Sequence, residues 1–263
     1  MGASGGSSIS CPEGYIPVPG NPEFNTEDFC VAKYEMKKVN IGGQDVAVSQ
    51  AAGTPWVSIN RNDTRAKCAA LGTGYSLITN DQWQTIARNI EQVAENWENG
   101  TIGSVLNRGH SDGDPYNALA ASTDDNQACS GTNQSCTGTS WNLQKRTHKL
   151  SNGEVIWDFA GNVWEWVYDD YSSLEVNPTI GTSFYEYNDT SVISAHNRKL
   201  FGPSNSTWTS AQGIGQIYGG SAGAVLRGGA WANLTFAGVF GTFLYRGLTY
   251  SDTGIGFRCS FVP

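Results

Sequence analysis

The chain has 263 residues and a formal net charge of −8, which is enough length for one large domain or two small ones. Only 15% of the residues are charged, whereas 32 are glycine, 9 tryptophan and 11 tyrosine, the opposite of a disordered composition. The negative charge argues against binding to nucleic acid or anionic lipid, and no apolar run reaches the ~18 residues of a spanning helix. We therefore expect a loop-rich globular protein that is not an integral membrane protein.

The two ends of the sequence differ in character. Residues 1–10 are rich in glycine and serine and lack the apolar middle of a secretory signal. We interpret them as a flexible tail or as a remnant in place of a removed leader. Residues 11–263 are expected to form a single domain.

The first elements follow from local patterns. Two β-favouring runs within residues 11–37, separated by turn residues, predict a hairpin. A helix is expected to begin near Asn62 and Asp63 and to end at Gly72. A second helix is expected between Asn80 and Gly100, where apolar residues recur at helical spacing.

The rest of the chain is less regular. Small polar residues dominate residues 100–149, and a loop of this length in an ordered domain usually carries function or is held by cross-links or metal. Aromatic residues are dense in residues 154–168, and short strands resume from Val225 onward. These patterns predict an α+β fold with short strands, two helices and long irregular loops.

Six cysteines allow 15 complete pairings. Spacing favours three disulfides. The first pair flanks the N-terminal segment, and the third closes a polar loop. The second ties an early helix to the last strand, and closing so long a loop would stabilise the folded state by about 4 kcal/mol. The three pairs are Cys11 with Cys30, Cys68 with Cys259, and Cys129 with Cys136. Free buried thiols in a reducing compartment are the alternative. The spacing does not suit zinc.

The segment DFAGNVWEW, residues 158–166, places Asp158 and Glu165 around a glycine turn. Calcium takes carboxylates and backbone carbonyls in such irregular loops, so this segment is a candidate cation site. The alternative is that the two carboxylates cap turns or pair with arginines near a tryptophan core. The familiar hydrolase, phosphate-binding and metalloprotease motifs are absent.

DFAGNVWEW, followed by LRGGAW and GFRC, resembles the formylglycine-generating (sulfatase-modifying factor) branch of the C-type lectin fold. The resemblance implies that this fold covers residues 11–263. It also implies a structural calcium ion held by Asp158, Gly161, Val163 and Glu165, with the two middle residues contributing carbonyls.

More narrowly, GYSLITNDQWQTIARNI with RGGAW, AGVF and IGFR resembles the variable proteins of diversity-generating retroelements. The resemblance implies a C-terminal variable region at about residues 226–258, in which mutable AAY codons become NNY codons. NNY codons cannot encode Lys, Glu, Gln, Met or Trp. Residues 230–254 contain none of these except Trp231, which belongs to the fixed RGG-x-W pattern.

The family pattern also implies which positions vary and form the ligand-binding surface. They are Ala230, Ala232, Asn233, Leu234, Phe236, Thr242, Phe243, Tyr245, Arg246, Leu248, Tyr250, Asp252 and Gly254. Trp164, Trp166 and Trp231 are expected as fixed scaffold beneath them. Aromatic residues with arginine are typical of protein-binding surfaces, although strand alternation predicts that one face of residues 242–247 is buried.

The resemblance leaves three function classes to weigh. A diversified binding module with a macromolecular, most simply protein, ligand and no catalysis fits best. A formylglycine-generating oxidase would need two cysteines at the positions of Asn233 and Gly238, where no thiol is present. A calcium-dependent sugar lectin would carry E-P-N or Q-P-D triplets, which are absent. A binding module of this kind is expected at a cell or virion surface or secreted.

Overall fold

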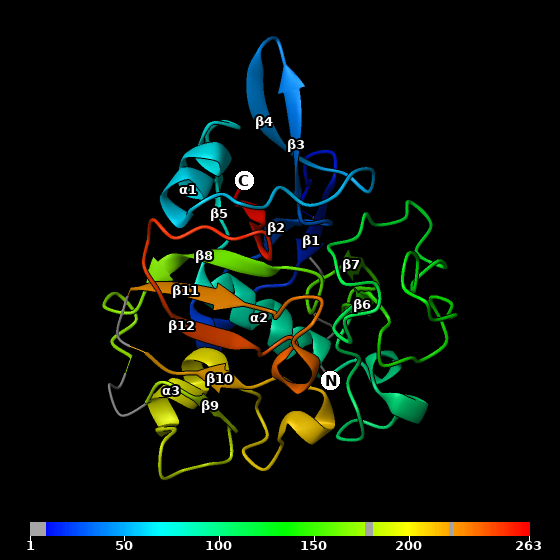
Figure 1. Ribbon diagram of the computed structural model, residues 1–263, viewed down its shortest axis with the longest axis vertical. Helices are drawn as coiled ribbons and strands as arrows, with labels where there is room; N and C mark the ends of the chain where they lie inside the picture. Colours follow the sequence, from blue (N-terminus) through cyan, green and yellow to red (C-terminus); the bar gives the residue numbers. More distant parts are fainter. Residues whose placement is uncertain (1–8, 177–180, 221–222) are drawn as a thin grey trace.

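The computed structural model describes residues 9–176, 181–220 and 223–263 (Figure 1). Residues 1–8, most of the expected N-terminal tail, lie outside this range. Within it, two sheets form the body and two short hairpins are appended to it. No helix in the described ranges is long and apolar enough to cross a membrane.

The first sheet contains the expected N-terminal hairpin. β1 (Tyr15–Val18) pairs antiparallel with β2 (Phe29–Ala32), and the order β1-β2-β14-β5 brings in β5 (Tyr75–Leu77) and β14 (Cys259–Phe261). The end of the chain therefore lies between two early strands. Two hairpins stand apart from this sheet: β3 (Met36–Ile41) with β4 (Gln44–Ser49), and β6 (Thr147–Lys149) with β7 (Val155–Trp157).

The second sheet has the order β13-β8-β11-β12-β10-β9. Its strands are β8 (Trp164–Asp170), β9 (Phe184–Tyr185), β10 (Ile217–Tyr218), β11 (Ala224–Arg227), β12 (Thr242–Arg246) and β13 (Ile255–Phe257). β8, β11 and β12 run side by side at its centre (Figure 1). The aromatic segment and the expected C-terminal strands thus meet in one sheet.

The helices differ from the sequence-based expectation in number and in their ends. α1 (Arg61–Ala69) begins slightly earlier than expected because the side chain of Asn60 caps it by accepting the N–H of Asp63. α2 (Asn80–Ile90) is capped by Thr79 and ends well before Gly100, after which two short 3₁₀ turns follow. A third helix, α3 (Ala195–Phe201), was not expected.

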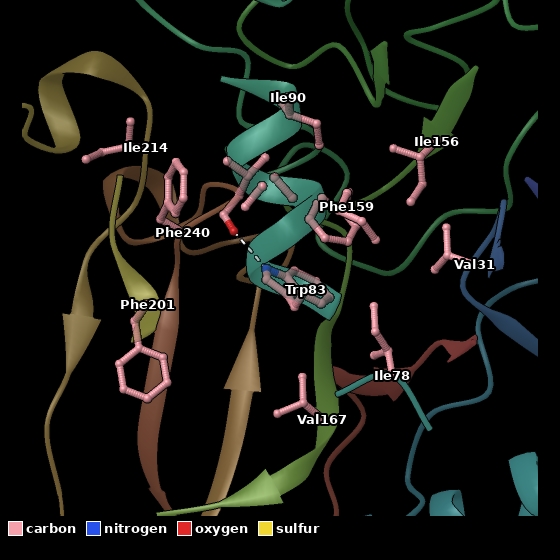
Figure 2. Packing of buried hydrophobic residues seen from close by; sticks show 14 of the residues in the cluster. Val31, Ile78, Trp83, Ile90, Ile156, Phe159, Val167, Phe201, Ile214 and Phe240 are labelled. Carbon is pink, nitrogen blue, oxygen red and sulfur yellow. Dashed lines mark hydrogen bonds between the residues drawn. The ribbon is translucent and has the colours of Figure 1, made fainter. Parts of the chain in front are cut away.

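The core forms where α2 packs behind the second sheet (Figure 2). Trp83 is fully buried, stacks on Phe159 at 3.9 Å between ring centroids, and donates its indole N–H to the carbonyl of Val239 at 2.9 Å. Such an acceptor offsets the cost of burying the indole N–H. The helical apolar stripe of the sequence is therefore core.

Three disulfides cross-link the chain, and they join the pairs that the cysteine spacing favoured: Cys11–Cys30, Cys68–Cys259 and Cys129–Cys136. The second spans 191 residues and connects α1 to β14. The third lies within the long loop between α2 and β6. The expected cross-linking of that loop is therefore present.

Candidate ligand-binding pocket

A cavity of about 340 Å³ opens between the second sheet and the loop that follows β11. This volume lies within the range of small-molecule and side-chain binding pockets. Its lining comes from several parts of the chain: Tyr116, Trp164, Phe184, Leu226, Ala230, Trp231, Ala232, Asn233, Phe236, Phe243, Arg246, Tyr250, Asp252, Gly254 and Ile255.

Most of the positions that the family pattern marks as variable line this cavity. Those that do are Ala230, Ala232, Asn233, Phe236, Phe243, Arg246, Tyr250, Asp252 and Gly254. Those that do not are Leu234, Thr242, Tyr245 and Leu248. Of the latter, Leu234 and Tyr245 are exposed and Leu248 is partly buried.

Thr242 is placed wrongly by the sequence pattern. Its side chain is fully buried, where the hydroxyl donates to the carbonyl of Phe240 at 3.0 Å and contacts the hydroxyl of Tyr187. Thr242 is a core residue because it and Leu244 occupy the inward face of β12. Its hydroxyl stays inside because both partners are within hydrogen-bond reach.

A β-bulge puts Arg246 on the pocket side. Leu226 pairs with Phe243 and Ala224 pairs with Arg246, so β12 advances three residues where β11 advances two. One extra residue reverses the alternation of side chains. Strict period-2 alternation would have grouped Arg246 with buried Leu244, whereas both Phe243 and Arg246 line the cavity.

Contacts between aromatic rings hold the pocket wall together. Phe236 stacks on Phe184 with 3.8 Å between ring centroids, and Phe243 stacks on Tyr218 with 4.4 Å between ring centroids. Phe243 also lies 5.9 Å from Trp164 beneath it. Aromatic pairs of this geometry contribute about 0.5–1.5 kcal/mol beyond area burial.

The three expected scaffold tryptophans have different environments. Trp166 is fully buried and donates its indole N–H to the carbonyl of Ile59 at 2.9 Å. Trp164 is buried but borders the cavity, and Trp231 is half-buried and lines it. Trp231 is therefore part of the cavity wall rather than of the core alone.

Two lining residues outside residues 226–258 were missed by the sequence analysis. Tyr116 reaches the cavity from the long polar loop, and Phe184 reaches it from β9. The length of that loop indicated function without indicating which residue carried it. Nothing in the local sequence distinguishes Phe184.

Backbone hydrogen bonds dock the Tyr116 loop against the pocket. The N–H of Gly113 donates to the carbonyl of Trp231 at 2.7 Å, and the N–H of Leu234 donates to the carbonyl of Ser111 at 2.8 Å. The Tyr116 ring lies 6.3 Å from that of Trp231. The loop therefore forms one rim of the cavity.

The two carboxylates of the expected calcium site, Asp158 and Glu165, are each paired with a buried arginine, which does not fit their use as calcium ligands. Arg146 holds both carboxylate oxygens of Asp158 at 2.6 and 2.7 Å, and Arg258 holds both of Glu165 at 2.8 and 3.1 Å. Because all four side chains are buried, each carboxylate is already compensated. Among the described residues, no cluster of His, Cys, Asp and Glu is suited to a metal. The arginine-pairing alternative describes Asp158 and Glu165.

A third buried carboxylate completes this charged layer. Glu35 accepts the side-chain amide of Asn162 at 2.6 Å and the N–H of Val163 at 3.2 Å. Burial, followed by the charge of Asp158, holds the pKa of Glu35 well above its usual range. The DFAGN turn is thus fixed by buried hydrogen bonds and ion pairs.

The geometry does not support thiol oxidation at the two positions that match the catalytic cysteines of formylglycine-generating enzymes. The Asn233 side chain accepts the N–H of Ala230 at 2.7 Å. At Gly238, φ is +157° and a Cβ would lie 2.3 Å from the backbone carbon of Ile214, so no cysteine could occupy this conformation without backbone movement. All six cysteines of the chain are in disulfides.

A family model described as "Sulfatase-modifying factor enzyme 1-like domain" matches residues 16–260. No curated protein matches the sequence. Among solved structures, Treponema denticola variable protein 1 is similar at 15% identity and a TM-score of 0.44, with 90% of this chain and 85% of that chain covered.

Two further structures are similar at comparable levels. PvdO from Pseudomonas aeruginosa has 15% identity and a TM-score of 0.42, covering 95% of this chain and 90% of that chain. The Major Tropism Determinant I1 variant has 14% identity and a TM-score of 0.42, covering 95% of this chain. The chain spans about half the length of that protein, 53%.

Proposed function

The chain belongs to the sulfatase-modifying factor enzyme 1-like domain family, and we propose that within this family it is a ligand-binding variable protein and not an enzyme. Its C-terminal surface would be diversified by a retroelement to bind changing protein targets. One observation carries the proposal: nine of the thirteen positions that the family pattern marks as variable line one cavity, although they are spread over 25 residues of sequence, 230–254.

The environment of these positions supports recognition rather than catalysis. The wall is mostly aromatic and apolar, which is typical of interface anchors. The matched catalytic positions carry Asn233 and Gly238 instead of cysteine. Three disulfides favour an oxidising environment, as a secreted, cell-surface or virion-surface protein would meet.

A library experiment tests the binding surface. The codons of seven half-buried or exposed lining positions would be randomised as NNY and the variants displayed on yeast: Ala232, Asn233, Phe236, Phe243, Arg246, Tyr250 and Asp252. We expect folded variants that bind protein baits which the parent does not bind, because these side chains face the cavity while the core is unchanged.

A matched control library would randomise Lys38, Asn40, Ile41 and Gln44, which are exposed on the β3–β4 hairpin. It should yield few binders because a two-stranded hairpin offers no cavity. Equal yields from the two libraries would contradict the proposed site.

The neighbouring DNA tests the retroelement separately. We expect an adjacent reverse-transcriptase gene and a near-copy of the 3′ end of this gene that differs at adenines. Their absence from the complete source genome would contradict diversification by a retroelement while leaving the binding surface to the library experiment.

A further inference from the structure

The cavity contains one cation without a partner. Arg246 is the only Lys or Arg among the lining residues, and within the described part of the chain its guanidinium forms no ion pair and no hydrogen bond. Its guanidinium carbon lies 4.3 Å from the ring centroid of Tyr250 and 5.5 Å from that of Phe243. Stacking on rings orients a guanidinium yet leaves its N–H groups available.

The only carboxylate in the lining is already engaged. Asp252 accepts the hydroxyl of Tyr250 at 3.1 Å and the N–H of Gly254 at 2.9 Å. These bonds orient the Tyr250 ring under Arg246, and Asp252 forms no ion pair with the arginine among the described residues. The result is a positively charged group fixed beside an aromatic and aliphatic wall.

Large apolar side chains continue beyond the cavity. Tyr116, which lines the rim of the cavity, is 76% exposed, and its ring lies against that of Trp231. Leu234 is 57% and Tyr245 46% exposed, and both lie beside the lining: Leu234 follows Asn233, and Tyr245 contacts Tyr218 next to Phe243. Exposed apolar groups around a pocket are typical of contact with a macromolecule. A small molecule would not cover them.

We infer that the partner presents a peptide segment in which a large apolar or aromatic side chain, inserted in the cavity, is followed or preceded by a carboxylate that pairs with Arg246. This inference rests on the proposed binding function and names the chemistry of its ligand. A carboxylate meets a guanidinium in a two-point hydrogen-bonded geometry that neutral groups cannot match.

The net charge of −8 opposes the approach of an acidic segment, but only over long distances. At physiological ionic strength, charges more than about 8 Å apart are largely screened. At contact distance the single guanidinium therefore decides the preference. Arg246 acts as a specificity-determining residue in this copy of the protein.

Selection from a random 12-residue peptide library displayed on phage tests the inference, with the immobilised wild-type chain as bait. We expect enriched peptides to carry Asp or Glu next to a large apolar residue. In synthetic versions, replacing that acid by its amide should weaken binding by about fivefold to tenfold. Arg246→Gln should weaken the acidic peptide equally and abolish the difference between acid and amide.

Two variants separate charge recognition from misfolding. Arg246→Lys keeps the charge and should retain a reduced preference for the acid. Arg65→Gln is the matched control, because Arg65 also stacks on a ring, 3.7 Å from the centroid of Tyr168, and lies outside the cavity lining; it should leave peptide binding unchanged. Thermal melting would establish that each variant is folded.

The outcomes distinguish this inference from the function on which it rests. Peptides that lose binding on Phe243→Ala but ignore the acid-to-amide change would overturn the ligand chemistry and uphold the pocket. Peptides indifferent to both Phe243→Ala and Arg246→Gln would contradict both. The absence of any enriched peptide would overturn the ligand chemistry and leave the binding surface to the library experiment.

Discussion

Two buried arginines, Arg146 and Arg258, and the pocket arginine, Arg246, have opposite surroundings. Arg258 donates to both oxygens of Glu165 and to the carbonyls of Ala32 and Trp157, and Arg146 is satisfied in the same way around Asp158. Arg246 stacks on two rings, and its guanidinium has no hydrogen-bond acceptor among the described residues. Fully paired buried charges specify a structure, whereas an unpaired cation at a cavity is available for a ligand.

The largest expected effect breaks the buried side of this comparison. Arg258→Met should lower the free energy of unfolding by about 4 kcal/mol, because it leaves the carboxylate of Glu165 buried and uncompensated. Urea denaturation would measure the change. The corresponding change in the pocket, Arg246→Met, should alter the free energy of unfolding by less than about 0.5 kcal/mol. Equal losses would remove the distinction between the two arginines.

The pH dependence of stability extends the comparison from buried arginines to a buried histidine. His148 is fully buried, and burial lowers its pKa from 6.5 to about 4. The unfolded chain therefore binds a proton at a higher pH than the folded chain, and stability falls as the pH drops from about 6.5 to about 4. We expect His148 to account for about 3 kcal/mol of this loss.

His148→Gln should flatten that part of the profile in urea titrations at a series of pH values. His196→Gln, at an exposed position, serves as the control and should leave the profile unchanged. A wild-type profile that His148→Gln does not alter would show that this histidine is not the source of the acid sensitivity.

Substitutions on the pocket side should have small effects on stability. The combined variant Ala232→Ser, Tyr250→Ser, Asp252→Asn changes partly or fully exposed side chains and should alter the free energy of unfolding by less than about 1 kcal/mol. Trp166→Ala, in the core beneath, should cost about 3–5 kcal/mol. If the triple variant unfolded like the tryptophan variant, these positions could not serve as interchangeable ligand contacts.

Calcium should have the smallest effect. Because Asp158 and Glu165 are each held by an arginine, neither EDTA nor added Ca²⁺ is expected to shift the melting temperature. A ligand bound at 100 times its dissociation constant would contribute about 2.7 kcal/mol, so a calorimetric scan would detect it. A calcium-dependent rise in Tm would restore the cation site that the sequence suggested.

The residues around the DFAGN turn illustrate where prediction from sequence ended. Both carboxylates were identified, and arginine pairing was one of two interpretations. The partners lie 12 and 93 residues away, however, and no local pattern links Glu165 to Arg258. Choosing between cation and arginine required the tertiary contacts.

By itself, the sequence determined the fold class, the N-terminal hairpin, the favoured cysteine pairs and most of the positions around the cavity, because these depend on local patterns and family motifs. Tertiary structure decided which candidates line the cavity. The bulge in β12 moved Arg246 outward while Thr242 stayed in the core, and chain packing brought Tyr116 and Phe184 to the rim. Strand register and long-range packing arise from contacts between distant residues, which a linear pattern does not contain.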